Sequence, residues 1–131
     1  MNSNDRKRIV IDVDGTLASV KAEGQDYADL EPNAVVLETL RSYREEGFYI
    51  VVNSSRNMRT YQNNLGLLQA NTLPKLIDWL KKHEVPYDEV HVGKPWCGFA
   101  GFYVDDKAIR PDEFASLSYE EILRLVGGES G

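Results

Sequence analysis

Short runs of β-branched and aromatic residues recur along the chain, and each run ends in polar residues. The runs cover residues 9–11, 48–52, 89–92 and 102–104. Runs of this length and composition are typical of strands buried in a parallel sheet, where both faces of a strand are covered. We therefore predict four strands, each of which brings its last residues to an edge of the sheet.

Helical patterns lie between these runs. Residues 33–46 have apolar positions at helical spacing and end at Gly47, where a helix C-terminus favours a left-handed residue. A second helix is predicted to begin at Thr72 as its N-cap, with Pro74 in the first turn, and to end near His83.

The remaining segments complete an alternating order of elements. Residues 57–71 are less regular, and we expect a helical turn or two there. Ser118 and Glu121 form a capping box that opens a last helix, which ends at Gly127 and Gly128. The order predicts an α/β fold, a three-layer Rossmann-like core with a mostly parallel sheet flanked by helices. In such sheets, ligands bind beyond the carboxyl ends of the strands.

Length and composition fit one compact domain. The chain has 131 residues, 42% of them hydrophobic, so we expect a single domain over residues 1–131 with flexible ends at 1–7 and 127–131. The single cysteine, Cys97, cannot form an intrachain disulfide and favours a reducing compartment.

Charge and hydropathy narrow the expected partners. The net charge of −6 argues against a protein that binds mainly to nucleic-acid phosphates or anionic lipid. No apolar run approaches the roughly 20 residues of a membrane span. The basic residues 6–8 are not followed by the apolar region of a signal peptide. We therefore expect a cytoplasmic protein without membrane or nucleic-acid partners.

The first polar strand end holds two acidic residues. Asp12 and Asp14 are two residues apart in an extended segment, so their side chains point the same way while Val13 points into the core. Two such carboxylates repel unless a cation lies between them or one keeps its proton. Oxygen ligands without nearby His or Cys favour a hard cation, in particular Mg²⁺. Alone, the motif is also compatible with a surface turn. An EF-hand loop is excluded, because its sixth position is Leu17 instead of Gly.

The later strand ends carry groups that suit a phosphate. Ser54 follows the second run, Lys94 the third, and Asp105 with Asp106 the fourth. A hydroxyl at a strand-to-helix turn can hold phosphate oxygens, and a lysine supplies a compact positive charge. Singly, Ser54 could be a helix cap and Lys94 a solvated lysine. Together, the ordered set favours a phosphate site.

In this order the residues resemble the four motifs of the haloacid dehalogenase-like (HAD) superfamily of phosphohydrolases. The resemblance covers about residues 8–126, with the first motif at residues 11–16. Four further segments resemble the small group often labelled capsule or polysaccharide biosynthesis phosphatases: residues 55–61, 86–89, 93–97 and 102–111. The expected fold is therefore the HAD core. Neither residues 17–32 nor residues 56–92 leave room for a cap domain.

The resemblance implies a Mg²⁺-dependent phosphatase that works through an aspartyl-phosphate. Asp12 would be the nucleophile, and Asp14 would protonate the leaving oxygen and later activate water. The metal ligands would be Asp12, the backbone carbonyl of Asp14, and Asp105. Asp106 would act through water or by orienting Lys94.

Further residues are implied around the phosphoryl group. Ser54 and Lys94, as a catalytic lysine, would bind its oxygens, with Ser55 beside them, and Thr16 would steady the loop. The family often has Thr where this chain has Ser54, and the hydroxyl is retained. A guanidinium suits phosphate and an indole offers a face to a sugar, so Arg56 and Trp96 are candidate substrate contacts.

The expected substrate is a small phosphorylated metabolite, a sugar or polyol phosphate of surface polysaccharide biosynthesis. Without a cap, the site should be open to a bulky substrate or covered by a second copy of the chain. The roles of four nearby residues stay open: Arg59, Tyr61, Cys97 and Phe99.

Three alternatives remain. A phosphatase for nucleic-acid ends or nucleotides is disfavoured by the acidic balance and by the absence of a basic aromatic strip. A receiver-like signalling module would place its acid pair at the first strand and its phosphorylated Asp at the third. Here a second acid pair comes last. A catalytically inactive phosphate-binding relative is disfavoured because all four motif positions keep their chemistry.

Overall fold

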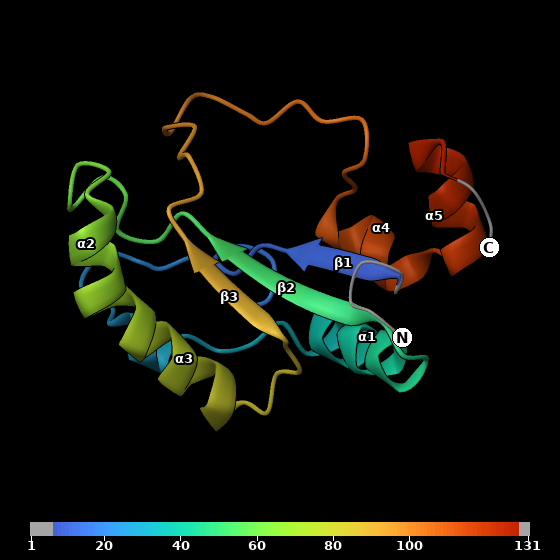
Figure 1. Ribbon diagram of the computed structural model, residues 1–131, viewed down its shortest axis with the longest axis horizontal. Coiled ribbons are helices and arrows are strands. Elements are labelled where there is room, and N and C mark those ends of the chain that lie inside the picture. The colour runs from blue at the N-terminus through green and yellow to red at the C-terminus, as the bar shows by residue number, and fades with distance from the viewer. Residues whose placement is uncertain (1–6, 129–131) are drawn as a thin grey trace. The chain divides into compact units, whose positions relative to one another are not determined.

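The computed structural model describes residues 7–128 and divides the chain into two compact units, which are considered separately. The first unit, residues 1–96, contains β1 (Arg8–Ile11), the 3-10 turn η2 (Tyr27–Asp29), α1 (Ala34–Glu45), β2 (Tyr49–Ser54), α2 (Leu65–Leu67), the π-helical turn η3 (Leu68–Thr72), α3 (Leu73–Lys82) and β3 (Glu89–Val92). The second unit, residues 97–131, contains α4 (Pro111–Ser116) and α5 (Tyr119–Val126) (Figure 1).

The sheet of the first unit is parallel, with strand order β1-β2-β3. Ile11 pairs with Val52, and Ser54 pairs with Val92, so the carboxyl ends of the three strands lie at one edge. An open parallel α/β sheet is therefore present, as the sequence predicts. The residues that follow these strand ends form the candidate site.

Two helices cover one face of this sheet. Both crossovers lead in the same direction along the sheet, and such connections are right-handed, so α1 and α3 lie on the same side of the strands (Figure 1). Arg41 of α1 donates Nη2 to the backbone carbonyl of His83, the residue after α3, at 2.9 Å. The buried side chains between helices and sheet include Leu40, Ile50, Val52, Leu76 and Leu80, all at 0% exposure. These residues form the core that holds the carboxyl edge.

The helix predicted over residues 33–46 is confirmed. Asn33 caps α1 by accepting the backbone N–H of Val36 at 3.2 Å, and Gly47 beyond its end has φ 91°. In the second unit the predicted capping box is present too. Ser118 accepts from the backbone N–H of Glu121, and Glu121 accepts from that of Ser118. Gly127 ends α5 with φ 69°.

The second predicted helix is present as α3, but it continues a helical path that begins before Thr72. Thr72 is not a cap: its backbone is helical, and its hydroxyl donates to the Asn57 side chain at 2.8 Å. The cap is Asn64, which accepts the backbone N–H of Leu67, and the helical path continues through η3 into α3. Pro74 lacks an N–H, and its ring would clash with a carbonyl in the preceding α-helical turn. The wider π-helical turn that ends two residues before Pro74 accommodates the proline.

The predicted fourth strand at residues 102–104 is wrong. These residues form no strand, and Phe102 and Val104 are 80% and 88% exposed. A strand needs a neighbour for its backbone groups, and the described part of the second unit contains none. Instead, that unit has a helix which the sequence analysis missed, α4, with Pro111 in its first turn. No helix over residues 7–128 combines the length and apolar character that a bilayer crossing requires.

Candidate active site at the carboxyl edge

A tight loop follows β1 and carries the two acids. Val13 is fully buried, and its carbonyl accepts the backbone N–H groups of Thr16 and Ala18 at 3.0 and 2.9 Å. Gly15 has φ 83°, a left-handed conformation that glycine adopts without steric cost. With Val13 anchored in the core, Asp12 and Asp14 lie on either side of it at the sheet edge. Both are half-buried.

Asp12 faces a lysine from the loop after β3, the strand at the opposite edge of the sheet from β1. The Nζ of Lys94 lies 3.7 Å from Oδ1 of Asp12, and the Lys94 backbone N–H donates to the carbonyl of Ser54 at 3.1 Å. Burial raises the pKa of Asp12; Lys94 and the Val13 backbone oppose this, and the charge of Asp14 adds to it. The first and third predicted motifs therefore meet at this edge. The neighbouring groups therefore compensate the charge of Asp12 incompletely.

Asp14 is held by an arginine from the loop after β2. Arg56 donates Nη2 to Oδ1 of Asp14 at 2.8 Å and Nε to Oδ2 at 3.2 Å. The Arg56 side chain is only 2% exposed. From the sequence this guanidinium is expected to contact substrate, whereas in the structure it contacts a carboxylate of the protein. That substrate contact stays a prediction.

Tyr27 covers the same guanidinium and was not singled out from the sequence. Its ring centroid lies 4.2 Å from Cζ of Arg56, close enough for a cation–π contact. Burial and then the charge of Asp14 raise the pKa of the Tyr27 phenol, and Arg56 opposes them. The segment that carries Tyr27 begins and ends in backbone pairing, with Ser19 donating to Glu31 and Asn33 to Leu17. The available signal was that Tyr27 is the one aromatic residue between residues 18 and 33.

Ser54 ends β2 and is buried, with 1% exposure. Its Oγ accepts the backbone N–H of Arg56 at 3.0 Å, which fixes the turn after the strand. A hydroxyl can accept and donate at once, so its proton remains available to an acceptor in the site. Ser55 beside it is half-buried, and its carbonyl accepts from the Met58 backbone.

The remaining predicted residues have different surroundings. Thr16 and Tyr61 are half-buried, and Arg59 is exposed. Trp96 is 38% exposed, two residues after Lys94. In the second unit, Cys97 is half-buried and Phe99 is 84% exposed. The exposure of these residues does not indicate a role for any of them.

Asp105 and Asp106 belong to the second unit and are exposed. Oδ1 of Asp105 accepts the backbone N–H of Lys107 at 2.8 Å, and Nζ of Lys107 donates to the carbonyl of Val126 at 3.3 Å. Over residues 7–128, no three His, Cys, Asp or Glu side chains gather as a metal-binding group.

The donor chemistry of the first unit nevertheless fits a hard cation. Asp12 offers carboxylate oxygens and carries a raised pKa, so a positive charge beside it would be stabilising. The Asp14 carboxylate is already paired with Arg56, which leaves its backbone carbonyl as a donor.

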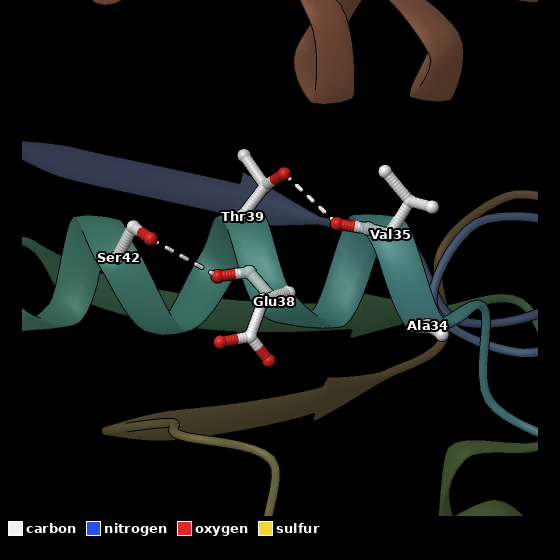
Figure 2. A pocket seen from close by; sticks show the side chains of 5 residues that line it. All are labelled: Ala34, Val35, Glu38, Thr39 and Ser42. Carbon is white, nitrogen blue, oxygen red and sulfur yellow. Dashed lines mark hydrogen bonds between the residues drawn. The ribbon is translucent and has the colours of Figure 1, made fainter.

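A hollow of about 500 Å³ lies elsewhere, on the outer side of α1. Figure 2 shows its lining residues: Ala34, Val35, Glu38, Thr39 and Ser42. Both hydroxyls are used within the helix, because Thr39 donates to the carbonyl of Val35 and Ser42 to that of Glu38. This hollow brings together no set of reactive groups, unlike the carboxyl edge of the sheet.

Comparison with solved structures identifies one close relative, an MCSG target from Vibrio cholerae with a crystal structure. It is 50% identical, has a TM-score of 0.88, and the match covers 92% of this chain and 97% of that one. The chain belongs to the same family as this Vibrio cholerae protein. A Pnkp1/Rnl/Hen1 complex matches at 19% identity and a TM-score of 0.47, over 86% of this chain and 35% of that one. No protein-family model matches the sequence, and no curated protein matches it.

Proposed function

We propose that this chain is a phosphomonoester hydrolase of the HAD superfamily, acting through a covalent phosphate on Asp12. The observation that carries the proposal is the meeting of Asp12 with Lys94 at 3.7 Å, at the edge where three parallel strands end. Nucleophilic attack on a phosphate monoester needs a carboxylate and a nearby positive charge, because the transferred group is anionic. The ordered HAD-like motifs of the sequence supply independent support.

In this proposal, residues of the first unit act as nucleophile and as proton donor and acceptor. An oxygen of Asp12 attacks phosphorus while the bond to the leaving oxygen breaks, and Asp14, as the general acid, gives that oxygen a proton. Asp14, now a carboxylate, takes a proton from water as the water oxygen attacks phosphorus and releases Asp12. Lys94 and the hydroxyl proton of Ser54 offset charge on the phosphoryl oxygens.

Mg²⁺ is the proposed cofactor. Asp12 and the backbone carbonyl of Asp14 would hold it, and the HAD resemblance adds Asp105 and Asp106. When bound, the ion supplies charge neutralisation for an anionic phosphoryl group.

For the substrate, we propose a sugar or polyol phosphate, on the resemblance to polysaccharide biosynthesis phosphatases. An open site would admit such a molecule, and a second copy of the chain could cover it. Hydrolysis of a panel of sugar, polyol and nucleotide monophosphates ranks this class against the nucleotide alternative.

The deciding experiment is hydrolysis of 4-nitrophenyl phosphate with Mg²⁺, with a chelator, and by Asp12→Asn. We expect the chelator and the substitution each to lower kcat by at least about 1000-fold, because each removes a component of covalent phosphoryl transfer. Asp78→Asn on the exposed side of α3 is the matched control and should keep full activity. Activity that survives both the chelator and Asp12→Asn would contradict the proposal.

A further inference from the structure

Arg56 lies where a substrate-binding arginine would not be expected. Its side chain is 2% exposed, and two of its nitrogens already bond to both carboxylate oxygens of Asp14. One face of its guanidinium lies against Tyr27, with 4.2 Å between Cζ and the ring centroid. Because so little of the side chain is exposed, a free phosphate has little access to it.

The arrangement restricts Asp14 more than a single hydrogen bond would. A two-point contact between a planar guanidinium and a carboxylate fixes the plane of the carboxylate as well as its distance. Arg56 is itself held at its backbone, because its N–H donates to Oγ of the buried Ser54. Thus the orientation of Asp14 is set from β2, although Asp14 follows β1.

The contact leaves part of the Asp14 carboxylate open to other partners. A carboxylate offers about four lone-pair positions, and Arg56 uses one on each oxygen. An acid–base carboxyl must point at the reacting oxygen, and small losses of orientation cost large factors in rate. A rigid partner that leaves lone pairs open satisfies both needs.

We infer that Arg56, covered by Tyr27, is a positioning residue that orients Asp14 for proton transfer, in place of a direct phosphate contact. The inference rests on the proposed function, in which Asp14 protonates the leaving oxygen. Its consequence is a dependence on the leaving group. Phenolate needs a proton more than 4-nitrophenolate does, because phenolate is the stronger base.

The test compares Arg56→Lys with wild type on phenyl phosphate and 4-nitrophenyl phosphate, with inorganic phosphate as a competitive inhibitor. General acid catalysis contributes about 100- to 10,000-fold, so we expect kcat on phenyl phosphate to fall by about 100-fold. On 4-nitrophenyl phosphate the fall should be about 10-fold or less. KM and the inhibition constant of phosphate should stay within about twofold, since no phosphate contact is lost.

A double-mutant cycle with Asp14→Asn isolates the route of the effect. If Arg56 acts through Asp14, Arg56→Lys should add no further loss on phenyl phosphate in the Asp14→Asn background. Arg124→Lys on the exposed side of α5 is the matched control and should leave all constants unchanged.

Tyr27 offers a second set of variants that keeps Arg56. Tyr27→Phe preserves the ring and should match wild type, whereas Tyr27→Leu removes the aromatic face and should lower kcat selectively on phenyl phosphate. Circular dichroism and thermal unfolding establish that each variant is folded.

Two results would overturn the inference while leaving the proposed function intact. One is a rise of about tenfold or more in both KM and the phosphate inhibition constant for Arg56→Lys. The other is equal loss on both substrates, additive with Asp14→Asn. If wild type shows no hydrolysis that Asp12→Asn abolishes, the proposed function fails, and this inference fails with it.

Discussion

At the scale of single residues, Asp12 occupies a place where a carboxylate is costly to the fold. Burial raises its pKa, and the Lys94 ammonium at 3.7 Å only partly offsets this. Groups that must react are often placed in such surroundings, and the fold then bears the cost. We therefore expect the Asp12 carboxylate to contribute to catalysis and to lower the stability of the folded state.

This cost gives a prediction for Asp12→Asn in the absence of metal. The folded-state pKa lies above the unfolded value of 3.8, so protonated Asp12 favours the folded state at low pH. That contribution is lost as pH rises through the folded-state pKa. At pH 7 the neutral amide should therefore raise Tm over that of wild type.

Thermal unfolding in a chelating buffer measures this difference between pH 3 and pH 7. The advantage of Asp12→Asn should shrink as the pH is lowered and the wild-type residue takes up its proton. A variant less stable than wild type at pH 7 would contradict the argument.

Residue types at strand ends could be predicted from sequence, but their pairings could not. The order of Asp12, Ser54 and Lys94 along the chain predicts that they share one edge, because parallel strands end together. Arg56 turns back toward Asp14 from a backbone that Ser54 helps to fix. Tyr27 reaches them through a segment with no regular pattern. Such orientations depend on contacts between distant segments, which local patterns do not contain.

At the scale of elements, the helical path from α2 through η3 to α3 shows how a local signal can mislead. Thr72 followed by Pro74 is typical of a helix start, yet Thr72 lies inside the path and bonds to Asn57. The true cap is Asn64, one of several polar residues before the path begins. Local chemistry allowed both starts, and tertiary packing selected one.

Asn64→Ala should therefore destabilise the protein by about 1 kcal/mol, the usual cost of losing an N-cap side chain. Urea unfolding at constant m-value measures the change. Asn71→Ala, an exposed residue within η3, is the matched control, and its effect should be within about 0.5 kcal/mol of zero. Equal effects of the two substitutions would remove Asn64 as the cap.

The failed strand at residues 102–104 has a different cause. Its residues have high β-propensity, but propensity expresses only how well a side chain fits a pleated surface. Pairing is a property of two segments, and no second strand exists in the described part of that unit. By contrast, the strand predicted at residues 89–92 formed because β2 provides a neighbour.

At the scale of the whole molecule, part of the excess of acidic residues belongs to the proposed metal site. The net charge is −6, and the proposed metal ligands account for part of that excess. Binding of a cation to the folded state alone raises the free energy of unfolding. Mg²⁺ should thus act on stability as well as on activity.

At a concentration 100 times its Kd, Mg²⁺ should stabilise wild type by about 2.7 kcal/mol, seen as a rise in Tm. Asp12→Asn and Asp105→Asn should each reduce this rise, since both are proposed ligands. Asp78→Asn should retain it. A full Mg²⁺ response in both ligand variants would contradict the proposed metal site.

The two tryptophans differ sharply in their surroundings. Trp79 is 2% exposed, donates its indole N–H to the carbonyl of Leu30 at 2.9 Å, and lies with its ring centroid 4.6 Å from that of His83. Trp96 is 38% exposed and stands two residues after Lys94. The two tryptophans should consequently emit at different wavelengths. The blue-shifted emission of Trp79 reports whether the core is intact, and the red-shifted emission of Trp96 comes from the chain beside Lys94.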